Sequence, residues 1–247
     1  MIEDADRALS QQQLQHCANE PIQTPGAIQP HGCLLAFDTT SLVVQQVSTN
    51  VEVFLGLSAT AALNRLITDA LPPRANQALM RALAGPAQEK FFALDVQGRQ
   101  LDGLLHEHEG TGILEIEPAS AHPLAEAALG TPTRRLMTVD TLQELFQATA
   151  ETVQALTGFD RVLVYRFDDD GHGEVISEAS AEDIESYLGL HYPESDIPRQ
   201  ARALYLRDWI RSIPDARYTS VPLALGSLIA LVHQSGGLRA LTSSTMK

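Results

Sequence analysis

Short apolar runs separated by turn residues fill the first half of the chain, and this pattern is typical of an antiparallel sheet. Between the second and third runs, residues 50–85 predict short helices, of which residues 75–85 form the clearest because Gly85 offers a stop. The five runs that predict strands cover residues 33–38, 42–49, 90–96, 99–109 and 112–118. This order predicts an α+β domain whose antiparallel sheet carries helices on one face.

The second half opens with a helical pattern and then returns to strands. Asp140, with Gln143 three residues later, predicts the start of a helix that ends at Gly158. Its apolar positions fall on one helical face: Leu142, Leu145, Phe146, Val153 and Leu156. Residues 161–168 and 173–180 then predict two strands joined by the turn DDDGHG.

An irregular stretch follows near Leu188 and leads into another helix. Asp196 is a favourable N-cap and Pro198 suits a first turn, so we expect a helix from Pro198 to about Arg207. Residues 119–137 are rich in Ala and Pro and then basic, which indicates a connector that starts as a helix. We therefore predict two α+β domains with these limits: an arm at 1–22, a first domain at 23–118, a linker at 119–137 and a second domain at 138–247.

Charge and composition argue against several kinds of partner. The 247 residues carry 31 Asp and Glu against 17 Lys and Arg, a formal net charge of −14, whereas a nucleic-acid surface needs clustered positive charge. The sequence has no apolar run of about 18 residues, and MIEDADRALSQQQ at its start lacks the order of a secretion signal. We therefore expect a cytoplasmic protein that binds neither nucleic acid nor membrane.

The two cysteines have different surroundings. The run CANEPIQTPGAIQPHG, which begins at Cys17, contains three prolines and predicts a stiff, extended arm. Polar neighbours make the Cys17 thiol accessible, either as a reactive group or as an inert surface group. Cys33 begins an apolar strand and is expected in the core. His16 and His31 lie nearby but lack the paired spacing of a zinc site, so we expect no metal.

The loop HYPESDIP, residues 191–198, is a second candidate site. Backbone groups released from regular pairing can face a ligand there, although a capped helix explains the same pattern. Five arginines lie in the next helix and just beyond it: Arg199, Arg202, Arg207, Arg211 and Arg217. They either bind ligand carboxylates or form a solvated face with Asp208 and Asp215. The sequence has no nucleophile elbow or phosphate-binding glycine loop, so we expect no enzyme.

Three ordered motifs resemble the PAS and GAF domains of bacterial phytochromes. They are C-x-x-E-P-I followed by PGAIQPHG, then TGFDRVLVYRFDDDGHGEVISE, and then SYLGLHYPESDIPRQARALYLRDWIR. The resemblance extends from about Cys17 to Leu223. It implies a PAS domain at 23–118, a GAF domain from 138 onward, and no kinase or other catalytic domain in this chain.

In that family, a GAF pocket holds the linear tetrapyrrole biliverdin, and a cysteine of the N-terminal arm adds to its ring A vinyl group. The resemblance implies that Cys17 forms this thioether and that red or far-red light acts by isomerising the chromophore. It also implies these pocket residues: Asp196, Ile197 and Pro198 of the DIP motif, Tyr165, Tyr192 and Tyr205 around ring D, Leu163 as an apolar wall, and Arg211 as the partner of a propionate. The other four arginines are still expected on the solvated surface.

Beyond Leu223, through residues 224–247, the chain departs from the family pattern. GSLIALVHQSGG is either a displaced copy of a late GAF strand or unrelated sequence. Most of the loop that forms the family's knot is missing, as are a second propionate-binding arginine and two pocket histidines. A GAF sheet without its later strands has an unpaired edge and an uncovered apolar face, so we expect marginal stability or a homodimer.

Two other functions stay open beside that of a photoreceptor. A PAS–GAF protein that has lost its pigment would serve as an interaction or dimerisation module with a signalling partner protein. A GAF domain can also bind a different small ligand, such as a nucleotide. Cys17, Tyr165 and the DIP motif together favour the bilin photoreceptor, whereas the altered end of the GAF region favours the interaction module.

Overall fold

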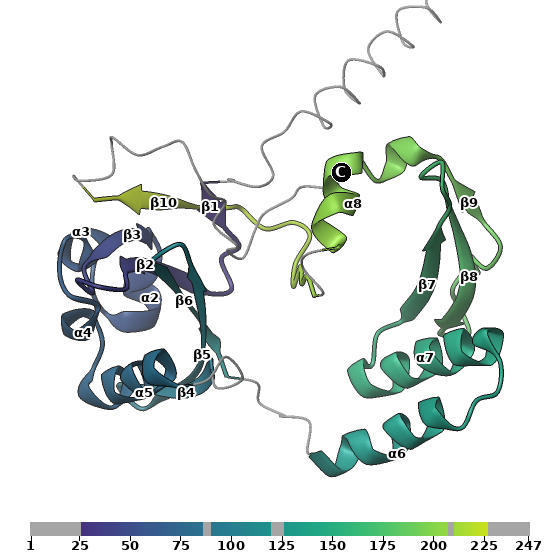
Figure 1. Ribbon diagram of the computed structural model, residues 1–247, viewed down its shortest axis with the longest axis horizontal. Coiled ribbons are helices and arrows are strands. Elements are labelled where there is room, and N and C mark those ends of the chain that lie inside the picture. Colours follow the sequence, from purple (N-terminus) through teal and green to yellow (C-terminus); the bar gives the residue numbers. More distant parts are fainter. Residues whose placement is uncertain (1–25, 86–89, 120–125, 207–209, 227–247) are drawn as a thin grey trace, which may run out of the picture. The chain divides into compact units, whose positions relative to one another are not determined.

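The computed structural model describes residues 26–85, 90–119, 126–206 and 210–226 (Figure 1). These residues form two compact units. One unit contains residues 26–119 of the described chain together with 210–226, and the other contains residues 126–206. Among the described residues, no helix is long and apolar enough to cross a membrane.

The first unit is built on a seven-stranded sheet in which every neighbouring pair is antiparallel. The five predicted strands are all present, within one or two residues of their expected ends. In spatial order the strands are β1 (Ala27–Ile28), β10 (Val221–Leu225), β3 (Val44–Ser48), β2 (Cys33–Asp38), β6 (Thr111–Pro118), β5 (Arg99–His108) and β4 (Phe91–Val96).

Four helices cover one face of this sheet, which confirms the predicted α+β class. They are α2 (Val51–Leu55), α3 (Ala59–Ala62), α4 (Ile67–Ala70) and α5 (Pro73–Ala84). Leu79 of α5 is fully buried in one apolar cluster with the alternate strand residues Leu35 and Phe37. Because side chains alternate across a strand, Leu34 and Ala36 face the other way, where they form a second, smaller apolar cluster.

Strand β10 lies between β1 and β3, although both of these strands precede it by more than 170 residues in the sequence. Val221 and Leu223 pack on the smaller apolar cluster, and the N–H of Leu223 donates to the carbonyl of Gly26 at 2.9 Å. The predicted limits assign β10 to the second domain. In the structure it completes the sheet of the first unit.

The second unit is a three-stranded antiparallel sheet of order β7-β8-β9 with a helix along one face. Its elements are α6 (Glu126–Met137), α7 (Leu142–Thr157), β7 (Arg161–Phe167), β8 (Gly173–Ser180), β9 (His191–Tyr192), the 3-10 turn η2 (Glu194–Asp196) and α8 (Arg199–Tyr205). The helix and both long strands appear where they are predicted. Residues 126–137 of the predicted linker form α6, whereas residues 120–125, near the start of the linker, lie outside the described residues.

Helix α7 begins one residue later than predicted. Its N-cap is Thr141, not Asp140, because the Thr141 hydroxyl accepts from the N–H of Glu144 at 3.2 Å. The Glu144 carboxylate in turn accepts from the N–H groups of Asp140 and Thr141, both at 3.1 Å, which completes a capping box. The packed face of the helix also differs from the predicted one: Leu142 is 70% exposed, whereas Ala148 is buried.

Helix α8 also differs from its predicted start. Asp196 lies in η2, and the N-cap is Pro198, whose carbonyl accepts from the N–H groups of Ala201 and Arg202. The backbone of Asp196 is already committed to η2, since its N–H donates to the carbonyl of Pro193 at 3.1 Å. The helix itself ends at Tyr205, and the predicted last residue, Arg207, is outside the described residues.

Candidate functional site

An aromatic cluster lies where β7, β8 and β9 meet. The ring centroids of Tyr165 on β7 and Tyr192 on β9 are 6.0 Å apart, and Phe167 packs edge-on to Tyr165 with centroids 5.0 Å apart. Gly173 of β8 is paired with both Phe167 and Tyr192 in the sheet. A Cβ atom at Gly173 would come within 2.0 Å of the Tyr165 ring, so glycine is what lets this ring lie across the strand.

The face of the sheet that carries this cluster is the face that α7 leaves open. Val164 is paired with Ser177, whose hydroxyl donates to Oε1 of Gln147 on α7 at 2.6 Å. Because side chains alternate along a strand, Leu163 points away from α7. The register shift after Val164 leaves the extra residue, Ile176, in β8, so β7 keeps its alternation and Tyr165 points the same way as Leu163. Both are half-buried. An apolar and aromatic surface is therefore available on this side of the unit.

The DIP motif follows β9 as a tight turn. Asp196 closes η2, Ile197 is extended, and α8 begins after Pro198. The side chain of Asp196 is exposed, whereas Ile197 and Pro198 are half-buried. The turn therefore brings one carboxylate and two apolar side chains together beside β9.

Electrostatics link this turn to the aromatic cluster. Burial raises the pKa of the Tyr165 hydroxyl, and the negative charge of Asp196 raises it further. Tyr192 and Asp168 act in the same direction, whereas the positive charge of Arg202 acts against them. Since the ordinary pKa of tyrosine is already about 10, Tyr165 is a neutral hydroxyl that can donate a hydrogen bond.

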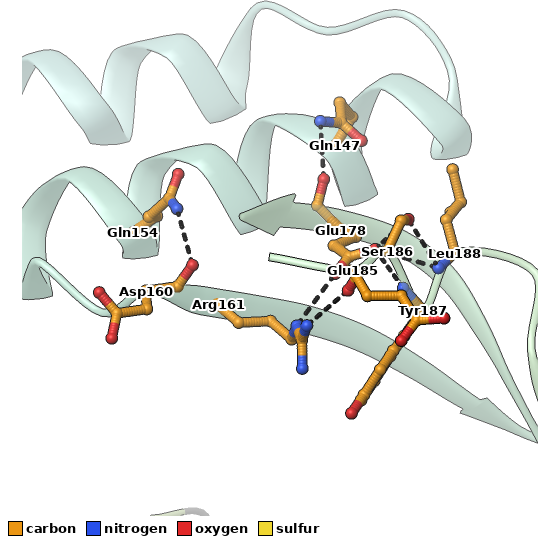
Figure 2. Close-up of polar contacts among 9 residues, drawn as sticks. All are labelled: Gln147, Gln154, Asp160, Arg161, Glu178, Glu185, Ser186, Tyr187 and Leu188. Carbon is orange, nitrogen blue, oxygen red and sulfur yellow. Dashed lines mark hydrogen bonds and ion pairs between the residues drawn. The ribbon is translucent and has the colours of Figure 1, made fainter. Parts of the chain in front are cut away.

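A polar cluster around Glu178 fixes the loop between β8 and β9 (Figure 2). One carboxylate oxygen of Glu178 accepts from the hydroxyl of Ser186 at 2.6 Å and from the N–H groups of Tyr187 and Leu188 at 2.8 and 3.0 Å. The other oxygen lies 3.2 Å from Nε of Arg161. The Arg161 guanidinium also stacks 3.8 Å above the centre of the Tyr187 ring.

These contacts decide the charge state of Glu178. Its side chain is only 4% exposed, and burial alone disfavours the carboxylate. The hydrogen bonds from Ser186, Tyr187 and Leu188 and the charge of Arg161 outweigh that effect and lower its pKa. The loop that Glu178 holds leads directly into β9, so this cluster helps to place Tyr192.

Two anchors of the site, Glu178 and Arg202, are not predicted from the sequence. The prediction of a solvated surface is wrong for Arg202, whose side chain is only 17% exposed and pairs with Glu194 at 2.6 Å. The same prediction is confirmed for Arg217, which is 93% exposed and lies 3.6 Å from Asp215. Arg202 also contacts Gly171, 31 positions away, and no local pattern reveals such a partner.

The structure brings most of the predicted site residues into one unit: Leu163, Tyr165, Tyr192, Asp196, Ile197, Pro198 and Tyr205. Tyr205 lies at the end of α8 and is 38% exposed. Arg211 is half-buried and belongs to the other unit, and Cys17 lies outside the described residues. Cys33 is fully buried in the core as predicted, and burial raises the pKa of its thiol.

Comparisons with known proteins agree with this architecture. A family model described as a PAS fold matches residues 17–119, and one described as a GAF domain matches residues 141–242. The latter match extends past Leu223, where the clear motif resemblance ends. The cyanobacterial phytochrome B of Nostoc sp. is 37% identical over 225 residues, and the bacteriophytochrome of Pseudomonas aeruginosa is 36% identical over 212.

Each of these two alignments covers more than four fifths of this chain but only 29% of the relative, so the chain spans less than a third of these relatives. Solved structures match over more of their length. The chromophore-binding domain of Stigmatella aurantiaca phytochrome P1 is 37% identical with a TM-score of 0.79, covering 93% of this chain and 78% of that one. A bacteriophytochrome chromophore-binding domain from R. palustris is 38% identical with a TM-score of 0.76, covering 84% and 70%.

Both units of this chain thus have counterparts in solved chromophore-binding domains. We call the unit that contains residues 26–119 the PAS unit and the unit that contains residues 126–206 the GAF unit; residues 210–226, which pack in the PAS unit, fall within the GAF match. The chain belongs to the bacterial phytochrome family and comprises a PAS region followed by a GAF region.

Proposed function

We propose that this chain is a red/far-red photoreceptor module that binds biliverdin through a thioether to Cys17. The observation that carries the proposal is the grouping of Tyr165, Tyr192 and Asp196 on one side of the GAF sheet. These residues come from β7, β9 and η2, and they are the residues to which the family resemblance assigns the pocket. The matched solved structures are chromophore-binding domains, which supports the same function.

The chemistry of the site suits a flat, conjugated ligand. Leu163, Ile197 and the tyrosine rings offer apolar and aromatic surface, and hydroxyl and backbone groups supply the few polar contacts that fix an orientation. In the proposed site, the Asp196 carbonyl accepts from pyrrole N–H groups, and Tyr165, Tyr192 and Tyr205 enclose ring D. Arg211 pairs with a propionate, because a guanidinium binds carboxylates in a bidentate manner. The bound pigment supplies the absorption of light and the isomerisation.

Attachment to Cys17 requires no further reactant. The sulfur adds to one vinyl carbon and the thiol proton goes to the other, so atoms and electrons balance without an oxidant. A stiff arm that holds the thiol beside the vinyl group raises its effective concentration. Cys33 cannot replace Cys17 in this reaction, because it is fully buried and its raised pKa disfavours the reactive thiolate.

A second function, a pigment-free interaction or dimerisation module, is favoured by the exposed apolar residues of the GAF unit. Leu188 is 57% exposed, Leu190 44% and Leu206 86%. Apolar surface of this kind is typical of protein contacts as well as of ligand grooves. Under this alternative, the chain acts in the cytoplasm as a homodimer or with a signalling protein, and it takes up no bilin.

Mixing the purified chain with biliverdin separates the two functions. The photoreceptor predicts a sharpened red absorption band and, after denaturation in acid with zinc, fluorescence that stays with the protein. Cys17→Ala should lose this bound fluorescence, whereas Cys33→Ala should keep it. A spectrum identical to that of free biliverdin would contradict the photoreceptor and favour the interaction module.

A further inference from the structure

Arg202 of α8 joins three separate segments of the GAF unit. Its guanidinium donates to the carbonyl of Ile197 at 2.7 Å, to the carbonyl of Glu194 at 3.1 Å and to the carboxylate of Glu194 at 2.6 Å. It also reaches the carbonyl of Gly171, in the turn between β7 and β8, at 3.4 Å. These acceptors flank Asp196 on both sides, so the arginine spans the DIP turn.

Gly171 is shaped to admit this guanidinium. Its φ is +82°, a conformation that favours glycine, and an added Cβ would lie 2.8 Å from a terminal nitrogen of Arg202 and 3.1 Å from Cγ of Glu194. Backbone of the β7–β8 turn is therefore packed directly against the Arg202–Glu194 pair. The guanidinium fork suits this place because its donors point in several fixed directions at once, which a lysine ammonium cannot reproduce.

Arg202 also acts on the aromatic cluster. Its positive charge opposes the effect of Asp196 on Tyr165, so both charges lie close enough to be felt at the tyrosine hydroxyl. The side chain is 17% exposed, which limits screening by water. The Arg202 guanidinium thus holds the turn that contains Asp196 and also opposes the effect of the Asp196 charge on the pKa of Tyr165.

We propose that Arg202 is the positioning residue of the site: it holds residues 194–197 so that the Asp196 carbonyl has a fixed direction toward the ligand. The expected effect on pigment attachment rests on the bilin function proposed above. The expected effect of Arg202 on the turn does not depend on pigment and can be measured on the pigment-free protein. The two parts can therefore fail separately.

Hydrogen exchange of the pigment-free protein tests the effect on the turn. Arg202→Gln removes the charge and most donors, and we expect about tenfold faster amide exchange in residues 168–172 and 194–197 with little change in β8, because local opening is governed by local contacts. Arg199→Gln is the matched control, since Arg199 is on the same helix and exposed. Equal exchange in the two variants, or an increase spread over the whole GAF unit, would overturn the proposal.

Two milder variants keep the test informative if Arg202→Gln does not fold. Arg202→Lys retains the charge but not the fork, and Glu194→Gln removes only the carboxylate partner while the carbonyl acceptors remain. Both should accelerate exchange in the same two segments, by less than Arg202→Gln. Exchange equal to that of the unmodified chain in both variants would overturn the proposal.

Assembly with biliverdin tests the consequence for the ligand. We expect Arg202→Gln to attach pigment about tenfold more slowly, or to a smaller extent, and to give a broader red band, because small displacements at a reacting site are costly. Arg202→Lys should be intermediate. Arg199→Gln should match the unmodified chain. If the unmodified chain takes up pigment and Arg202→Gln behaves identically, Arg202 does not position the site. If the unmodified chain takes up no pigment, the proposed function fails, and hydrogen exchange alone decides whether Arg202 holds the turn.

Discussion

The PAS core and the candidate site of the GAF unit are held together in different ways. In the PAS unit, Leu35, Phe37, Leu79 and Leu114 belong to one apolar cluster and are fully inaccessible to solvent. In the GAF unit, every residue of β7 is at least partly exposed, and the loops of the candidate site are held by the charged residues Glu178 and Arg202. Apolar burial is strong but has no direction, whereas hydrogen bonds fix the direction of a group.

The difference explains why the candidate chemistry lies in the GAF unit. A ligand needs groups that are partly accessible and held in definite orientations, and a closed apolar core offers neither. We expect the two units to respond differently to the same kinds of substitution.

The largest effect should come from the PAS core. Phe37→Ala removes a fully buried ring and should lower the free energy of unfolding by about 3–5 kcal/mol, because the apolar contacts are lost and a cavity remains. Urea unfolding followed by circular dichroism measures this change. Phe91→Ala is the matched control, since Phe91 is 62% exposed at the edge strand β4. Similar losses in both variants would contradict the core assignment.

The second effect is the loss of a charged anchor in the GAF unit. Glu178→Gln keeps the size of the side chain but removes the charge that accepts from Ser186 and two backbone N–H groups. We expect a loss of about 1.5–3 kcal/mol, seen in urea unfolding and as faster amide exchange at residues 186–188.

Glu174→Gln on the same strand is the control for Glu178. Glu174 pairs with Arg166, whose side chain is 61% exposed, and an exposed pair contributes at most about 1 kcal/mol. Equal losses in the two variants would show that Glu178 is no more than a surface charge.

Acid should weaken the GAF unit through the same carboxylate. The folded pKa of Glu178 is lowered from its ordinary 4.5, so the folded state favours the ionised form. This stabilisation is complete above pH 4.5 and is lost as the pH falls through the lower folded pKa. The stability difference between the unmodified chain and Glu178→Gln should therefore be constant near neutral pH and shrink below about pH 4.5. A difference that does not change with pH would contradict the charged anchor.

The smallest effect should come from the helix cap of α7. Thr141→Ala removes the hydroxyl that accepts from Glu144 and should cost about 1 kcal/mol in urea unfolding. Asp140→Ala leaves this capping box intact, because only the backbone N–H of Asp140 takes part in it. A larger loss of stability for Asp140→Ala than for Thr141→Ala would instead indicate that Asp140 is the N-cap, as the sequence predicts.

The sequence is sufficient to predict features that depend on residues close together in the chain. The short apolar runs at 33–38 and 112–118, each bounded by turn residues, predict both strands, and Gly158 correctly predicts the end of α7. The N-cap of α7 is harder to predict, because Asp140 and Thr141 are adjacent candidates and only the hydrogen bonds of Glu144 decide between them.

Features that depend on distant pairing are not visible in the sequence. No local property of residues 221–225 shows that they pair with β1 and β3. In the sequence, Arg202 resembles four other arginines nearby. Its buried position is recognised only in the folded chain, where the carbonyl of Gly171 lies beside its guanidinium. The predicted site residues Tyr165, Tyr192 and Asp196 lie together, whereas Cys17 and Arg211 stay predictions.

We propose that the open face of the GAF sheet is a light-sensing pigment site, and reversible photoconversion is the sharpest test of this function. The purified chain is assembled with biliverdin and illuminated alternately with red and far-red light while its absorption is recorded. We expect a reversible difference spectrum that is absent in Cys17→Ala and retained in Cys33→Ala. No reversible change in the unmodified chain, with the spectrum of free biliverdin, would contradict the claim.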